Sequence, residues 1–130
     1  MKFNRDAPTA VTIRHVEKGM LKVGAETVTE SVVLFRDSVQ RGPVAEDISR
    51  LTVSDLQHLI DAGPEIIIVG TGWTQALPPR ELVFALAKKG IGFEVMDTPA
   101  ACRTFNILVS EDRDVAAVLA VYLSLIHISE

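Results

Sequence analysis

The sequence is poor in cysteine and has no concentration of positive charge. Cys102 is the only cysteine among 130 residues, which excludes an intramolecular disulfide and any zinc cluster built from cysteines. A single thiol fits a reducing compartment. Lysine and arginine number 13 against 17 aspartate and glutamate residues, for a net charge of −4, and no basic run is longer than Lys88–Lys89. This balance argues against nucleic acid or an anionic membrane surface as the main partner.

The chain also lacks the patterns of a signal peptide and of a membrane span. No apolar stretch follows Lys2 and Arg5, so we expect a cytoplasmic protein without a secretion signal. The apolar run from Val115 to Ile128 is shorter than the roughly 20 residues that a membrane span needs. Part of that run, Leu123–Glu130, matches the translation of a common transposon-based sequencing adapter. We therefore expect one globular domain over 1–122 and exclude 123–130 from the fold.

The first part of the chain has the pattern of β-strands. Apolar and polar residues alternate from Val11 to Val16, which is the period of a half-buried strand. Glu17–Gly19 predicts a turn before a short partner strand over Met20–Val23. Ser31–Phe35 is continuously apolar after its serine and predicts a strand buried on both faces. Further turns or loops are predicted at 24–26 and 40–43.

From residue 48 onward, helices alternate with strands. Thr52 and Asp55 have the spacing of an N-cap and its capping partner, and Gly63–Pro64 ends that helix. Next come a predicted strand over 65–70, a helix over 80–89 and a strand over 92–96; the inner face of that helix would be Leu82, Val83, Leu86 and Ala87. A further helix follows, with Thr98 as its N-cap and Pro99 at its first position. The segment 115–121 is predicted as a final strand or, alternatively, a short helix. Strand, helix and strand at this spacing predict a parallel βαβ unit.

Two polar turns follow neighbouring strands of this unit. Gly70-Thr71-Gly72 comes after the first strand, and Asp97-Thr98 comes after the second. Because crevices form at the carboxyl ends of parallel strands, we expect both turns to border one hollow. The N-terminus of the Pro99 helix would point into it and favour an anion. A dinucleotide fingerprint would need a third glycine where Gln75 stands, so the alternative for the glycines is a tight turn with positive φ.

The helix after Asp97 carries an arginine and the cysteine. Arg103 opposes the helix dipole, so it needs a negative partner: Asp97 or another local carboxylate, or else a bound anion or an acidic partner segment. Cys102 is either a thiolate activated by its surroundings or a residue packed against the sheet. Nucleophilic catalysis would also need a base, and nothing in the sequence places His15 or His58 beside Cys102.

Three more side chains have two alternative roles each. Asn106 and Thr104 either satisfy backbone groups of neighbouring loops or contact a ligand. Trp73 is the only tryptophan and follows Gly72 in a loop. It is either an anchor at a protein interface or a cover over the edge of the sheet.

The motifs of this region resemble one known family. Gly70-Thr71-Gly72, Pro78-Pro79, Met96-Asp97-Thr98 and Ala100-Ala101-Cys102-Arg103-Thr104-Phe105-Asn106 are similar to the small domains related to mitochondrial complex I assembly factor 3 and to the adipogenesis-associated protein that shares its domain. Bacteria carry stand-alone relatives. Phe105 stands where relatives often have tyrosine, which removes a hydroxyl. The resemblance implies a three-layer α/β domain with a central mixed sheet, and an assembly chaperone rather than an enzyme with a shared catalytic residue.

The sequence thus predicts an α/β domain with a β-rich N-terminal part that acts as a non-catalytic interaction protein. Its role would resemble that of an assembly factor for respiratory complex I or for membrane proteins, with a protein partner and with a homodimer left open. The alternative is a small-molecule or anion site, enzymatic or not, bordered by Gly70–Gly72, Asp97 and Arg103. No cofactor, metal site or catalytic residue is predicted. The candidate binding residues are Gly70, Thr71, Gly72, Trp73, Asp97, Thr98, Arg103 and Asn106.

Overall fold

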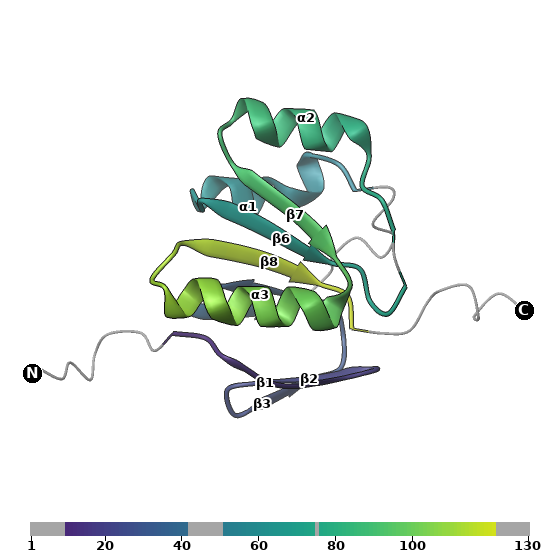
Figure 1. Cartoon of the computed structure of the whole chain (residues 1–130), viewed down its shortest axis with the longest axis vertical. Coiled ribbons are helices and arrows are strands. Elements are labelled where there is room, and N and C mark those ends of the chain that lie inside the picture. Colours follow the sequence, from purple (N-terminus) through teal and green to yellow (C-terminus); the bar gives the residue numbers. More distant parts are fainter. Residues whose placement is uncertain (1–9, 42–50, 75, 122–130) are drawn as a thin grey trace, which may run out of the picture.

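A computed structural model describes residues 10–41, 51–74 and 76–121. Its N-terminal part is a small antiparallel sheet of three strands, β1 (Ile13–Glu17), β2 (Met20–Val23) and β3 (Glu26–Val28), in that order. Figure 1 shows this sheet below the rest of the molecule. The predicted adapter segment 123–130 lies outside the described residues.

The larger sheet is mixed, as predicted. It has five strands in the order β5-β4-β8-β6-β7. The strands are β4 (Val32–Phe35), β5 (Ser38–Arg41), β6 (Ile66–Gly70), β7 (Gly92–Met96) and β8 (Val115–Leu119). β6 runs parallel to both β7 and β8, whereas β4 is antiparallel to β8 and β5. The prediction of a strand for the last segment is therefore confirmed.

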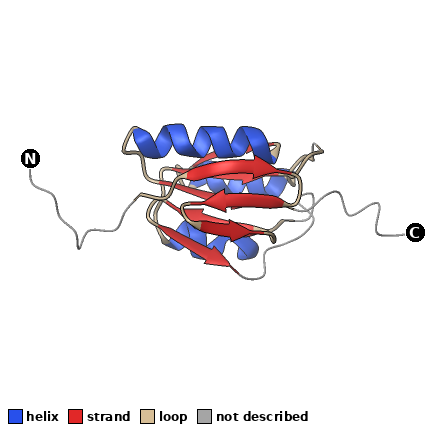
Figure 2. Ribbon diagram, turned by 90° about the horizontal axis from the view of Figure 1, so that it is seen from below, coloured by secondary structure: helices blue, strands red, loops and turns tan. Residues whose placement is uncertain are grey.

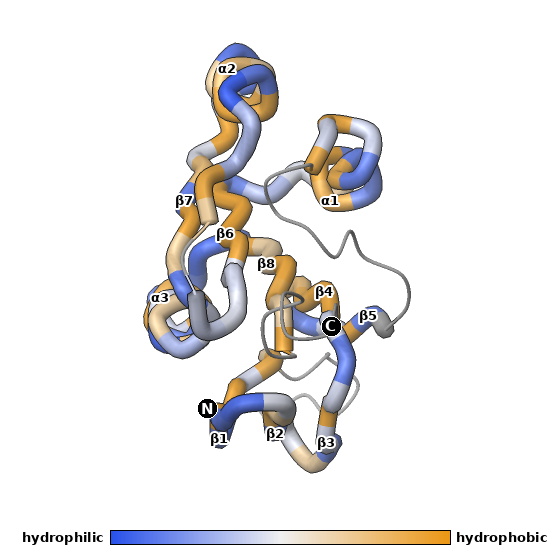
Figure 3. Tube along the Cα trace, turned by 90° about the vertical axis from the view of Figure 1, so that its right-hand side faces the viewer, coloured by the Kyte–Doolittle hydropathy of each residue, from blue (hydrophilic) through white to orange (hydrophobic). Residues whose placement is uncertain are grey.

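Helices cover both faces of this sheet. A 3₁₀ turn (Ser54–Leu56) leads into α1 (Gln57–Asp61), which lies with α2 (Arg80–Lys88) on one face. α3 (Thr98–Ser110) and the three-stranded sheet lie on the other face. Figure 2 shows the helices above and below the strands, and Figure 3 shows the same layers from the side. The arrangement is the three-layer α/β architecture expected, with β6, α2 and β7 as its βαβ unit.

Each face of the large sheet has its own apolar core. On one face, Ala101, Cys102 and Phe105 of α3 pack with Leu21 and Val28 of the small sheet. On the other face, side chains of the two remaining helices pack on the alternate residues of the strands, chiefly Leu59, Leu82 and Leu86. Apolar burial on both faces explains why β6 and β8 are almost entirely apolar in sequence.

The sequence predicts more buried residues on the inner face of α2 than the structure has. Leu82 and Leu86 are buried, but Val83 is 38% exposed and Ala87 is exposed. α2 covers the end of the sheet, so only a narrow stripe at i, i+4 spacing meets the strands. The outer side of α2 also exposes Phe84.

The predicted loops of the N-terminal part were partly wrong. Glu26 begins β3, and Gln40 and Arg41 belong to β5; Gly42 and Pro43 lie outside the described residues. A register shift between Ile13 and His15 also interrupts the expected alternation of β1, so that His15 is exposed and Val16 is partly buried.

The predicted capping box at Thr52 is formed. The Thr52 backbone N–H donates to Asp55 Oδ2 over 2.9 Å, and the Asp55 N–H donates to Thr52 Oγ1 over 3.2 Å. These two bonds satisfy donors that the start of a helix leaves open. Gly63 ends the helical segment with a φ of 73°.

Candidate functional site

The carboxyl ends of β6, β7 and β8 meet at Thr98, which is fully buried. Thr98 Oγ1 accepts the N–H of Gly72 over 2.8 Å and donates to the carbonyl of Ala120 over 2.6 Å. The Thr98 N–H donates to the Gly72 carbonyl over 2.8 Å, and the Ala120 N–H donates to the Gly70 carbonyl over 2.9 Å. One hydroxyl therefore ties together the segments that follow three parallel strands.

Asp97, not Thr98, is the N-cap of α3, which corrects the prediction. Asp97 Oδ1 accepts the N–H of Ala100 over 2.8 Å, and its carbonyl accepts the N–H of Ala101 over 2.9 Å. Thr98 is the first residue of the helix and Pro99 the second. With the cap supplied by the aspartate, the threonine hydroxyl is available for the buried bonds at the sheet.

The two glycines of the turn have different reasons to be glycine. Gly72 has a φ of 86°, as the tight-turn reading predicts. Gly70 is close to its neighbours: a Cβ there would lie 2.9 Å from Thr98 Oγ1 and 3.1 Å from the Cβ of Ala101. The two turns thus touch each other where a crevice was expected between them.

A small hollow lies beside this contact. It has a volume of about 260 Å³ and is lined by Thr71, Ala76, Leu77, Val95 and Met96. None of these side chains is ionisable, and the Thr71 hydroxyl is already bonded to the carbonyl of Thr74 over 2.8 Å. The hollow suits an apolar group. Asp97 and Arg103 do not line it.

Arg103 and Trp73 lie at the surface of this end, to different degrees. Arg103 is exposed on α3, and no described carboxylate is within salt-bridge distance of it, so the expected pair with Asp97 is not formed. Trp73 is half-buried.

Asn106 holds the small sheet against α3. Its Oδ1 accepts the N–H of Ile13 and its Nδ2 donates to the Ile13 carbonyl, each over 2.9 Å. The side chain amide thereby pairs with β1 as a neighbouring strand would, which agrees with the backbone-satisfying reading. Thr104 instead directs its hydroxyl to the Met96 sulfur over 3.5 Å.

Cys102 is packed, as its spacing with Ala101 and Phe105 predicts. It is 2% exposed, and burial raises the pKa of its thiol to about 12, against a smaller opposite effect of Arg103. His15 pairs with Glu17 on β1 over 2.9 Å, and His58 lies on α1 at another part of the molecule. The described residues therefore give this thiol neither exposure nor a base.

The amino ends of the parallel strands carry a charged surface that the sequence did not reveal. A hollow of about 680 Å³ there is lined in part by Arg36, Asp37, His58, Asp61 and Asp114. These residues come from three separate segments, and only the pairing of β4 with β8 brings Arg36 near them. Among the described residues, no group of three or more acidic, histidine or cysteine side chains has a geometry that could hold a metal ion.

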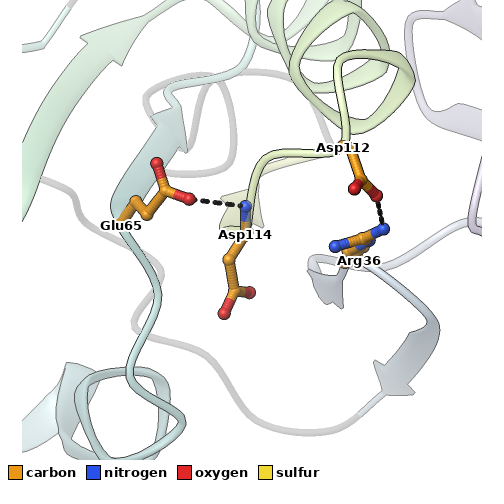
Figure 4. Close-up of polar contacts among 4 residues, drawn as sticks. All are labelled: Arg36, Glu65, Asp112 and Asp114. Atoms are coloured by element: carbon orange, nitrogen blue, oxygen red, sulfur yellow. Dashed lines mark hydrogen bonds and ion pairs between the residues drawn. The ribbon is translucent and has the colours of Figure 1, made fainter.

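Two exposed ion pairs border this surface. Arg36 pairs with Asp112 (Figure 4). Arg113 Nε donates to Glu65 Oε1 over 2.8 Å. The second Glu65 oxygen accepts the N–H of Asp114 over 3.4 Å. The hydrogen bond from Arg113 is the main reason that the pKa of Glu65 is lowered. The two ion pairs connect the turn after α3 to the segment before β6, through Glu65, and to the end of β4, through Arg36.

Comparison with known proteins identifies relatives over most of the chain. A family model described as "Protein of unknown function (DUF498/DUF598)" matches residues 13–120. NADH dehydrogenase (ubiquinone) 1 alpha subcomplex assembly factor 3 of Bos taurus is 36% identical over 120 residues, which cover 90% of this chain and 64% of that protein. The 13 kDa major membrane protein of Francisella tularensis is 39% identical over 74 residues, 57% of this chain and 60% of that protein. The chain thus spans less than two thirds of these curated relatives.

Solved structures share the fold. An NMR structure of a Xanthomonas campestris protein has a TM-score of 0.82 at 29% identity, covering 93% of this chain and 92% of that one. A crystal structure from Bordetella parapertussis has a TM-score of 0.79 at 34% identity, covering 88% and 98%. A structure from Bartonella henselae, called an outer membrane protein, has a TM-score of 0.71 at 28% identity, covering 88% and 98%.

Within residues 10–41, 51–74 and 76–121, no helix has the length and apolar character to cross a membrane. The family match over 13–120, the relatives and the shared fold agree with the motifs around Gly70–Gly72 and Asp97–Asn106: the chain belongs to the DUF498/DUF598 family, which includes assembly factor 3 of NADH dehydrogenase.

Proposed function

We propose that this chain is a non-catalytic interaction protein that assists the assembly of respiratory complex I or of other membrane proteins. The observation that carries the proposal is the similarity to the Bos taurus assembly factor, which extends over 90% of the chain. Relatives whose names call them membrane proteins are consistent with a membrane-associated target. We further propose that the chain works on the cytoplasmic side.

The chemistry of the candidate site supports binding over catalysis. Cys102 is buried and protonated, and the Thr98 hydroxyl is occupied by two internal bonds. The first turn of α3 also has no free donor for an anion: the N–H groups of Thr98, Ala100 and Ala101 are bonded to Gly72 and Asp97, and Pro99 has none. An anion at this helix end would moreover meet the Asp97 carboxylate.

Protein contact is better supported at the surface around this end. Arg103 is exposed without a described partner, and Ile107, one helical turn further along α3, is 55% exposed. Arginine beside an apolar group is a common composition of interfaces. We propose Arg103 and Trp73 as partner-contacting residues, while Gly70, Thr71, Gly72, Asp97, Thr98 and Asn106 hold the turns and helix that present them.

Affinity capture tests the proposal. The full chain is the bait in a bacterial membrane extract, and Arg103→Ala is compared with Arg14→Ala, which removes another exposed arginine from β1. We expect subunits of respiratory or membrane-insertion complexes to be retained by the wild type and by Arg14→Ala, and retention to fall at least tenfold with Arg103→Ala. Trp73→Ala should act in the same direction. If the wild type retains no such subunit, the assembly role is wrong.

A further inference from the structure

β7 is an edge strand of the five-stranded sheet. Among the described strands it pairs with β6 alone, at the opposite end of the sheet from β5. Figure 3 shows β7 as the last strand of the row, with α2 and α3 on opposite sides of it.

The hydrogen bonds of β7 show which backbone groups face outward. The Gly92 N–H donates to the Glu65 carbonyl, and the Met96 carbonyl accepts the N–H of Thr71, each over 2.9 Å. In a parallel pair, alternate residues direct both backbone groups to the same neighbour, so Phe93 and Val95 direct theirs away from β6. None of the described residues bonds to these two N–H and two C=O groups.

On β1, in contrast, a side chain bonds to backbone groups of the strand. There, the side chain of Asn106 bonds to both the N–H and the carbonyl of Ile13. An exposed strand edge is a template for another strand, and proteins commonly cover or block it. Within the described part of the chain, β7 has no such amide.

The surroundings of the β7 edge define what would fit on it. Phe93 and Val95 direct their side chains to the α2 face, where the 260 Å³ apolar hollow begins at Val95 and is bordered by Leu77, which is 83% exposed. Glu94 points to the opposite face and is exposed. An added strand would therefore place alternate side chains next to an apolar surface and next to a carboxylate.

We propose that the β7 edge binds an extended segment of a partner protein by strand addition. The segment alternates apolar residues, which lie on the α2 face and fill the hollow, with a lysine or arginine beside Glu94. Backbone bonds to Phe93 and Val95 supply the pairing, and the side chains supply the selectivity. The inference rests on the proposed function, because it names the kind of partner that an interaction protein of this fold recognises.

A second copy of this chain is a poorer occupant. An antiparallel pair that uses the outward groups of both Phe93 and Val95 places Glu94 directly opposite Glu94 of the other copy. Like charges at directly opposed positions destabilise a strand pair. The charge on this edge thus favours a basic partner over self-pairing.

Proline substitution at Val95 tests the edge with a matched control. Val95→Pro removes only an outward N–H, which an edge strand tolerates, and Val95→Ala truncates the same side chain but keeps the N–H. A displayed library of random linear 12-residue peptides is selected on the full chain, and an enriched peptide is titrated by fluorescence anisotropy. We expect apolar–basic alternation in the enriched peptides and at least tenfold weaker binding to Val95→Pro than to Val95→Ala. Glu94→Lys should weaken the same peptide at least tenfold.

Several results would overturn the strand addition. These are no enriched peptide, equal affinity of the two Val95 variants where thermal melting shows both folded, or peptide-induced amide NMR shifts that leave Phe93 and Val95 unmoved. Self-association of the wild type that Val95→Pro abolishes would assign the edge to a second copy instead. The membrane capture separates the two hypotheses: equal capture of subunits by the Val95 variants rejects the edge and keeps the assembly role, whereas no capture by the wild type rejects the assembly role whatever the peptide does.

Discussion

The two ends of the parallel strands differ in what their polar groups do. At the carboxyl ends of β6, β7 and β8, the polar groups are buried and bond to one another through Thr98. At the amino ends, the charged groups are exposed: the side chains of Arg36 and Asp112 are 40% and 81% exposed. A buried polar group that loses its hydrogen bond destabilises the folded state, whereas an exposed ion pair adds little to the stability of the fold. The first end therefore stabilises the fold, and the dense run of polar residues in sequence there supplies buried hydrogen bonds.

The largest expected effect comes from breaking the Thr98 contact. Thr98→Val keeps the shape but leaves the Gly72 N–H and the Ala120 carbonyl without their bonds. Each unsatisfied buried group costs about 1–3 kcal/mol, so the loss of both bonds should lower the free energy of unfolding by about 2–6 kcal/mol. Urea unfolding followed by circular dichroism measures the change.

Thr104→Val is the matched control on the same helix, because its hydroxyl contacts only the Met96 sulfur among the described atoms. We expect a loss below about 1 kcal/mol for this variant. Similar losses for the two variants would remove the special role of Thr98.

Gly70→Ala should rank second. The added methyl group would lie 2.9 Å from Thr98 Oγ1 and 3.0 Å from Leu119 Cδ2, so the three strand ends must separate. Overpacking of this kind costs about 1–3 kcal/mol. Gly92→Ala is the comparison at the amino end of β7, where the nearest atom is Ile66 Cγ1 at 3.3 Å and the strand is at the sheet edge. Thermal unfolding of the two variants should show the greater loss for Gly70→Ala; the reverse order would contradict close packing at the carboxyl ends.

The N-cap of α3 should rank third. Asp97→Ala removes the acceptor of the Ala100 N–H and should lower the free energy of unfolding by about 1 kcal/mol. Asp97→Asn keeps an acceptor at the same place and should lose much less. If both substitutions lower the denaturation midpoint equally, the charge rather than the cap is what stabilises the helix.

The elements could be predicted where one local signal decides them. The apolar strands β4, β6 and β8 and the capping box of Thr52 follow from residues next to one another in sequence. Asp97 and Thr98 are both good capping residues, so the choice between them could not be made locally. It is decided by the Gly72 and Ala120 backbone groups, which reach Thr98 only after the sheet has formed.

The candidate site was predictable in part for the same reason. The adjacency of the Gly70–Gly72 turn to Asp97–Thr98 follows from parallel strand order, and the structure brings these turns together. Whether adjacent turns leave a crevice depends on side chain volumes, and the Thr98 side chain fills this one. Arg36 and Asp112 of the charged surface are far apart in sequence, and no local sequence pattern predicts that they pair.

The smallest expected effect concerns Glu65 at the amino ends. Its pKa lies below the usual 4.5 in the folded protein, mainly because Arg113 donates a hydrogen bond to it. The folded state therefore holds this proton more weakly than the unfolded chain, and the stabilisation is present above about pH 4.5 and lost as the pH falls through the lower native pKa. The thermal midpoint of the wild type should exceed that of Glu65→Gln slightly at neutral pH, and the difference should shrink below about pH 4.5. Glu111→Gln, which removes an exposed carboxylate without a described ion pair, should show no such convergence with the wild type. The difference in thermal midpoint between the wild type and Glu65→Gln could instead stay constant down to the acid transition. In that case the hydrogen bond from Arg113 does not form in solution, and Glu65 adds nothing to the stability of the amino ends through it.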